Sequence, residues 1–83
     1  MSELNTVREI LRNTLQLGDR ADAFTESTSL LGSIPELDSM AVVTILTTVE
    51  DHYGIIIEDD EVSAETFTDL GSLALFVEEK INE

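Results

Sequence analysis

Apolar residues recur at helical spacing in three stretches of the chain. This spacing predicts amphipathic helices over residues 3–16, 39–53 and 70–81, each with one apolar side. The residues expected on the inner sides are Leu4, Val7, Ile10, Leu11 and Leu15, then Val42, Ile45, Leu46, Val49 and Tyr53, and finally Leu70, Leu73, Phe76, Val77 and Ile81. Helices of this kind bury their apolar sides against one another, which predicts an all-α protein.

Polar residues and glycines at the ends of these stretches mark the helix boundaries. Small polar side chains cap the first turn of a helix, and glycine readily ends the last turn. The expected caps and stops are Ser2 and Gly18 for the first helix, Asp38 and Gly54 for the second, and Thr68 or Asp69 at the start of the last.

The connections between the helices differ in length and character. Residues 17–37 form a long first loop, which we expect to be pinned across the bundle by Phe24, Leu30, Leu31, Ile34 and Leu37. Residues 55–57 are three isoleucines without a second strand to pair with, so we predict a buried connector. The acids of residues 58–61 suit the start of a short third helix. The expected fold is a small four-helix bundle, with three main helices and one short one, in a single domain spanning residues 1–83.

Charge narrows the range of partners. The chain has 83 residues and a net charge of −14, and it is too apolar, at 42% hydrophobic residues, to be a disordered acidic tail. Residues 1–35 carry a net charge of −2 and residues 36–83 a net charge of −12. Such a surface repels nucleic acids and anionic lipids and attracts proteins with basic patches. Simple solubility explains the acids equally well. Without a signal sequence or a membrane-spanning stretch, the expected location is the cytoplasm, with no membrane insertion.

Catalytic and metal-binding arrangements are poorly supported. Ser39 and His52, the only histidine, lie on one predicted helix about 20 Å apart, too far for a hydrogen bond in a catalytic triad. The carboxylates of residues 58–61 lack the glycine-punctuated spacing of a calcium loop, so we predict no specific metal site. The chain also has no cysteine, which removes thiol nucleophiles and disulfides.

Ser39 is the remaining chemical candidate. It stands where the long first loop meets the second helix, in the sequence Asp38-Ser39-Met40. Free N–H groups and partial positive charge at a helix start favour an attached phosphodiester. A simple capping serine fits the same pattern.

With these features the whole chain resembles the acyl carrier proteins, small acidic four-helix bundles whose modified serine opens the second helix. The resemblance is carried by Asp38-Ser39-Met40, by Leu30-Leu31-Gly32 before it, by Ala41 to Leu46 and Tyr53 to Val62 after it, and by Phe67-Thr68-Asp69-Leu70-Gly71-Ser72-Leu73. It implies a non-catalytic, free-standing and monomeric carrier. Acyl or aminoacyl groups would be held as thioesters on a 4′-phosphopantetheine arm attached to Ser39.

The resemblance also implies partners. A phosphopantetheinyl transferase would take the arm from coenzyme A, with Asp38 helping it to dock, and acyl-loading and acyl-using enzymes with basic patches would follow. On the outer side of the second helix we predict partner contacts at Met40, Thr44, Thr47 and Asp51, together with the acids Glu50, Glu58, Asp59 and Asp60.

Two departures from the family pattern point away from ordinary fatty-acid synthesis. Pro35-Glu36-Leu37 replaces a small pair before Asp-Ser, and Thr44 and Thr47 are neutral where many relatives place acids. They favour a carrier for a dedicated biosynthetic cluster or for an activated amino acid. An acidic interaction module or inhibitor without a prosthetic group is the competing hypothesis.

Overall fold

The computed structural model describes residues 2–82, apart from the side chains of Ser2 and Asp59. Three α-helices dominate it, and three short 3₁₀ helices lie in the connections between them. The elements in chain order are α1 (Ser2–Leu15), η1 (Gly18–Ala23), α2 (Ser39–Tyr53), η2 (Asp59–Glu61), η3 (Ala64–Phe67) and α3 (Leu70–Ile81). Within residues 2–82 there is no β-strand, only an isolated bridge between Ser29 and Asp69. The prediction of an all-α bundle is confirmed.

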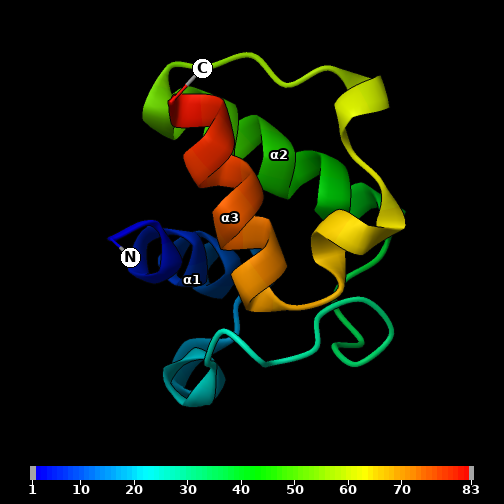
Figure 1. The fold of residues 1–83 in the computed structure, drawn as a ribbon. Helices are drawn as coiled ribbons and strands as arrows, with labels where there is room; N and C mark the ends of the chain where they lie inside the picture. The colour runs from blue at the N-terminus through cyan, green and yellow to red at the C-terminus, as the bar shows by residue number, and fades with distance from the viewer. Residues whose placement is uncertain (1, 83) are drawn as a thin grey trace.

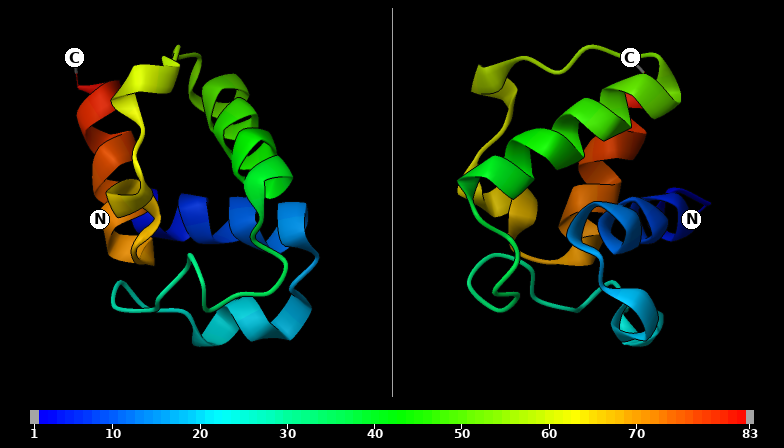
Figure 2. Two further views of the ribbon diagram at one scale, coloured as in Figure 1. Left: turned by 90° about the vertical axis from the view of Figure 1, so that its right-hand side faces the viewer. Right: turned by 180° about the vertical axis from the view of Figure 1, so that it is seen from behind.

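Helix α1 is the common packing partner of the two other long helices. It contacts both α2 and α3, and η1 lies against it as well. Figure 1 shows α3 in front of α2, with α1 crossing near the lower end of α3. The two turned views in Figure 2 show the long first loop passing below α1 on its way from η1 to the start of α2.

The core forms along the predicted inner sides of the helices. The side chains at its centre are the fully buried Val7, Leu11, Ile45, Val49, Leu70, Leu73 and Val77. One predicted inner residue is wrong, because Ile81 at the end of α3 is 36% exposed, while Ala74 is buried instead.

The end of α1 differs from the prediction. The helix stops at Leu15 because Gln16 adopts a left-handed conformation with φ of 55°. The Leu17 N–H then donates to the Arg12 carbonyl at 3.0 Å, which closes the last turn in a Schellman-type arrangement. Gly18 is therefore not the stop but the first residue of η1. Ser2 lies inside α1 rather than before it.

The long first loop is fastened to the start of α3 by backbone hydrogen bonds. Leu30 donates to the Thr68 carbonyl at 3.1 Å, and Gly71 donates to the Glu26 carbonyl at 2.8 Å. A Cβ on Gly71 would lie 2.9 Å from that carbonyl oxygen, so only glycine allows this close approach. Leu30 is fully buried as predicted, but Leu31 is 46% exposed, so it does not pin the loop.

The connection from α2 to α3 is less helical than predicted. The expected short helix is divided into η2 and η3, because Ser63 has an extended backbone between them. Val62 turns toward the core at this break. Of the three isoleucines before it, Ile55 and Ile57 pack against the core, whereas Ile56 is 73% exposed and was wrongly predicted to be buried.

Candidate functional site

The start of α2 is built by local contacts around Asp38. Its backbone is extended, and its Oδ1 atom accepts a hydrogen bond from the Ala41 N–H at 2.8 Å. The Asp38 carbonyl accepts from the Val42 N–H at 2.9 Å. Asp38 is thus the N-cap of α2, as predicted, and the helix begins at Ser39.

Ser39 is exposed at the first position of this helix. The N–H groups of a first helical turn point outward along the axis, and the helix dipole favours negative charge there. A phosphodiester on the Ser39 hydroxyl would therefore lie in a favourable field. A hydroxyl at this place is open to an enzyme that approaches from solvent.

The chain's only histidine, His52, does not lie where it could act as a catalytic base for Ser39. His52 is exposed in the last turn of α2, thirteen positions along the same helix, which is about 20 Å away. Its ring instead makes an edge contact with Tyr53, with centroids 4.7 Å apart. The structure therefore agrees with the rejection of a Ser39–His52 triad.

A cleft of 280 Å³ opens beside α2, one turn beyond Ser39. One wall is the face of α2, and the other is the chain between Ile57 and Val62. The lining residues are Val42, Val43, Leu46, Thr47, Glu50, Ile57, Glu58 and Val62. Five of these eight residues are apolar, and the cleft lies along the same helix as the exposed Ser39.

The outer wall of the cleft is held by side chains. The carboxylate of Glu50 accepts from the Ile57 N–H at 2.7 Å, and that of Glu61 accepts from the Glu58 N–H at 2.8 Å. The ammonium of Lys80, whose side chain is only 10% exposed, lies 2.6 Å from the other oxygen of Glu61. The hydrogen bond from Lys80 and that from Glu58 hold the pKa of Glu61 below its ordinary value.

Comparison with solved structures decides the family. The chain matches the solution NMR structure of a holo acyl carrier protein from Nitrosomonas europaea, with 53% sequence identity, a TM-score of 0.93 and 100% coverage of both chains. No protein-family model matches the chain, and no curated protein sequence matches it.

The chain belongs to the acyl carrier protein family.

In this carrier protein the predicted outer stripe of α2 is exposed. Met40 is 77% exposed, and Thr44, Thr47 and Asp51 are exposed as well. Sequence reasoning missed Val43, an apolar residue of the same helix that is 62% exposed and lines the cleft. Its position next to Thr44 in the helical pattern could have revealed it. Binding of a partner by this stripe stays a prediction.

The predicted acidic contacts of the carrier protein fall into two groups. Asp51, Glu58 and Asp60 are exposed, whereas the Asp59 side chain lies outside the described part of the structure. Glu50 is half-buried, and its carboxylate is bound to the Ile57 N–H. Glu50 therefore has a structural role that its place in the sequence did not indicate.

The described part of the structure shows neither a cluster of metal-binding side chains nor a membrane-spanning helix. Among residues 2–82, leaving aside Asp59, no three acidic or histidine side chains gather closely enough to hold a metal ion. In the same range, every helix is too short or too polar to cross a bilayer.

Proposed function

We propose that this acyl carrier protein holds its acyl or aminoacyl cargo as a thioester on a 4′-phosphopantetheine arm attached to Ser39. A transferase would join the Ser39 oxygen to the phosphorus of the arm in coenzyme A. The bond between that phosphorus and the adenosine 3′,5′-bisphosphate would break, and the serine proton would leave with the products. The protein itself carries out no reaction on the cargo.

The observation that carries this proposal is the exposed Ser39 at the capped start of α2, in a chain 53% identical to a holo carrier. The chain has no cysteine, so it cannot form a thioester with its own side chains. A thiol delivered on a long arm supplies what the sequence lacks. Ser63 also opens a helix, but η3 has only four residues and therefore little dipole.

The cleft beside α2 suits the apolar part of such a cargo. Val42, Leu46 and Val62 offer apolar surface within it, and burial of apolar surface contributes about 25 cal/mol per Å². We expect the methyl signals of these residues to shift in NMR spectra when the arm carries an octanoyl group. With an acetyl group they should hardly move. Equal spectra for the two cargoes would exclude this place for the acyl chain.

Mass spectrometry of the intact protein tests the attachment of the arm to Ser39. The apo protein, incubated with coenzyme A and a broad-range phosphopantetheinyl transferase, should gain the mass of one arm. Ser39→Ala should gain nothing while its helical circular dichroism is unchanged, and the control Ser63→Ala should be modified like the natural chain. Modification of Ser39→Ala would refute the assignment. A natural chain that takes no arm would favour the acidic interaction module.

The oligomeric state, the cellular location and the partner enzymes of the carrier form a second part of the proposal. We propose that residues 1–83 act as a single carrier domain, monomeric and cytoplasmic, that meets a transferase through Asp38 and cargo enzymes through basic patches. The neutral Thr44 and Thr47 support a dedicated pathway rather than general fatty-acid synthesis. An ordinary rate of elongation by fatty-acid synthase enzymes would count against the dedicated pathway.

A further inference from the structure

The chain approaches Ser39 through a short turn, residues 33–38, which we call the approach segment. The Leu37 N–H donates to the Ile34 carbonyl at 3.0 Å, and both side chains are buried. These contacts anchor one side of the turn in the core. Pro35 and Glu36 stand on its exposed side, separated from Asp38 only by Leu37.

A bidentate ion pair between Arg20 and Glu36 anchors the exposed side of the approach segment. The Arg20 Nη1 atom lies 2.5 Å from Glu36 Oε2, and Arg20 Nη2 lies 3.1 Å from Glu36 Oε1. Two parallel bonds fix the orientation of the carboxylate as well as its distance, which one lysine contact cannot do. The hydrogen bond from Arg20 lowers the pKa of Glu36, so the pair stays charged at neutral pH.

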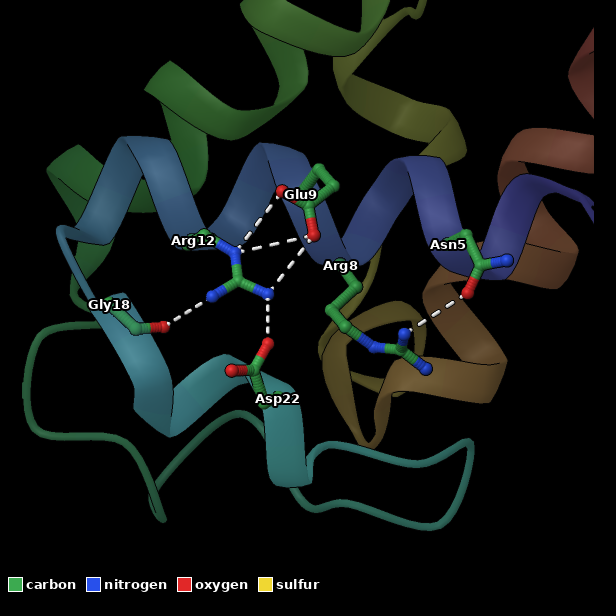
Figure 3. Close-up of polar contacts among 6 residues, drawn as sticks. All are labelled: Asn5, Arg8, Glu9, Arg12, Gly18 and Asp22. Atoms are coloured by element: carbon green, nitrogen blue, oxygen red, sulfur yellow. Dashed lines mark hydrogen bonds and ion pairs between the residues drawn. The ribbon is translucent and has the colours of Figure 1, made fainter.

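The arginine in this pair is itself held to the bundle. Arg20 belongs to η1, and Arg12 of α1 binds η1 through the Gly18 carbonyl at 2.6 Å and the Asp22 carboxylate at 2.5 Å. Figure 3 shows the Arg12 guanidinium placed between these groups and Glu9 of its own helix. A continuous set of polar contacts thus leads from α1 through η1 to the approach segment.

We propose that Arg20 and Glu36 are positioning residues for the modification of Ser39. By holding the exposed side of the approach segment, they fix where Asp38 and Ser39 are presented to the transferase. This inference rests on the proposed attachment of the arm to Ser39. Neither residue touches the reacting atoms, so their effect is on presentation of the serine.

The two charges allow positioning to be separated from long-range attraction. Glu36→Gln removes a negative charge that would attract a basic transferase, whereas Arg20→Gln removes a positive charge that would repel it. If attraction alone mattered, the two substitutions would change kcat/KM in opposite directions. If the pair positions the serine, both lower it, because each breaks the same contact. An exposed pair of this kind should change kcat/KM by about two- to fivefold.

The test measures kcat/KM for arm transfer from coenzyme A by a broad-range transferase. Arg20→Lys keeps the positive charge but cannot make the two parallel hydrogen bonds. Its kcat/KM should therefore lie between those of the natural chain and Arg20→Gln. The double variant Arg20→Glu with Glu36→Arg restores the pair and should recover most of the rate. Glu79→Gln is the matched control, since it removes one exposed carboxylate from α3, outside the contacts that hold the approach segment. Its rate should equal that of the natural chain.

The outcomes separate this inference from the proposed function. The positioning role is supported if Arg20→Gln and Glu36→Gln both lower kcat/KM while the melting temperatures stay unchanged. The double variant should then recover most of the natural kcat/KM. Opposite changes in Arg20→Gln and Glu36→Gln, or natural rates in both, overturn the positioning role while the attachment stands. If the natural chain takes no arm, the attachment is wrong and this inference is wrong with it. Should Arg20→Gln fail to fold, Arg20→Lys and Glu36→Gln decide the matter in the same assay.

Discussion

Substitution of Asp38 separates the capping of α2 from the recognition proposed for the same carboxylate. Its Oδ1 atom accepts from the Ala41 N–H at 2.8 Å. Asp38→Ala removes this acceptor and leaves a helix-start N–H without a side-chain partner, which costs about 0.5–2 kcal/mol. For a domain of this size each 1 kcal/mol lowers the melting temperature by about 4–8 °C. Asp38→Asn keeps an acceptor in place and loses only the favourable charge at the helix start, about 0.3–1 kcal/mol.

The assay combines thermal unfolding, followed by circular dichroism, with the rate of arm transfer to Ser39. Asp38→Ala should lower both the melting temperature and the rate of arm transfer. Asp38→Asn should also lower the rate of arm transfer, with a smaller fall in melting temperature of about 1–8 °C. Asp69 is the matched control, since it caps α3 by accepting from the Ser72 N–H at 2.7 Å. Asp69→Ala should melt at a lower temperature and be modified at the natural rate. If Asp38→Asn is modified as fast as the natural chain, the charge of Asp38 has no role in recognition and the prediction is wrong.

Four further predictions cover the core, the partner surface and the acid response. Ile45→Ala, at a fully buried position, should cost about 2–5 kcal/mol in urea unfolding. Asp51→Lys should slow association with the transferase, and the natural rate should fall as salt shortens the reach of charge to about 8–10 Å; a rate indifferent to both would exclude steering. Thr44→Glu should raise the rate at which fatty-acid synthase enzymes load and elongate the carrier, and an unchanged rate would count against a dedicated pathway. Lys80 lowers the pKa of Glu61 below its ordinary 4.5, so the stability that Glu61 gains in its ionised form is full above that value and is lost as the pH falls through the lowered one. The stability difference between the natural chain and Glu61→Gln should therefore be constant above about pH 5 and shrink in stronger acid.

The candidate site could be predicted because the signals that build it are local. The cap from Asp38 acts over three residues, and the left-handed Gly54, with φ of 68°, ends the helix within one turn. The apolar spacing between them then fixes which side of α2 faces the core. Ser39 therefore has a determined place at the helix start and an exposed side chain before any long-range contact is considered.

The contacts that fasten the connections could not be predicted in this way. Arg20 and Glu36 are sixteen residues apart, and Lys80 and Glu61 nineteen, so only packing of the helices brings each pair together. The structural use of the Glu50 carboxylate likewise depends on how the chain folds back after α2. A sequence with 18 acidic residues gives no local sign of which of them these cations will select.

The errors about exposure have the same origin. Leu31, Ile56 and Ile81 are as apolar as their buried neighbours, yet each is at least 36% exposed. The sequence by itself determined the three long helices, their inner sides and the serine at the start of α2, because caps and helical periodicity act within a few residues. Only the tertiary structure decided the path of the loops, the ion pairs that hold them and the cleft beside α2. Those features depend on distances between residues that are far apart along the chain.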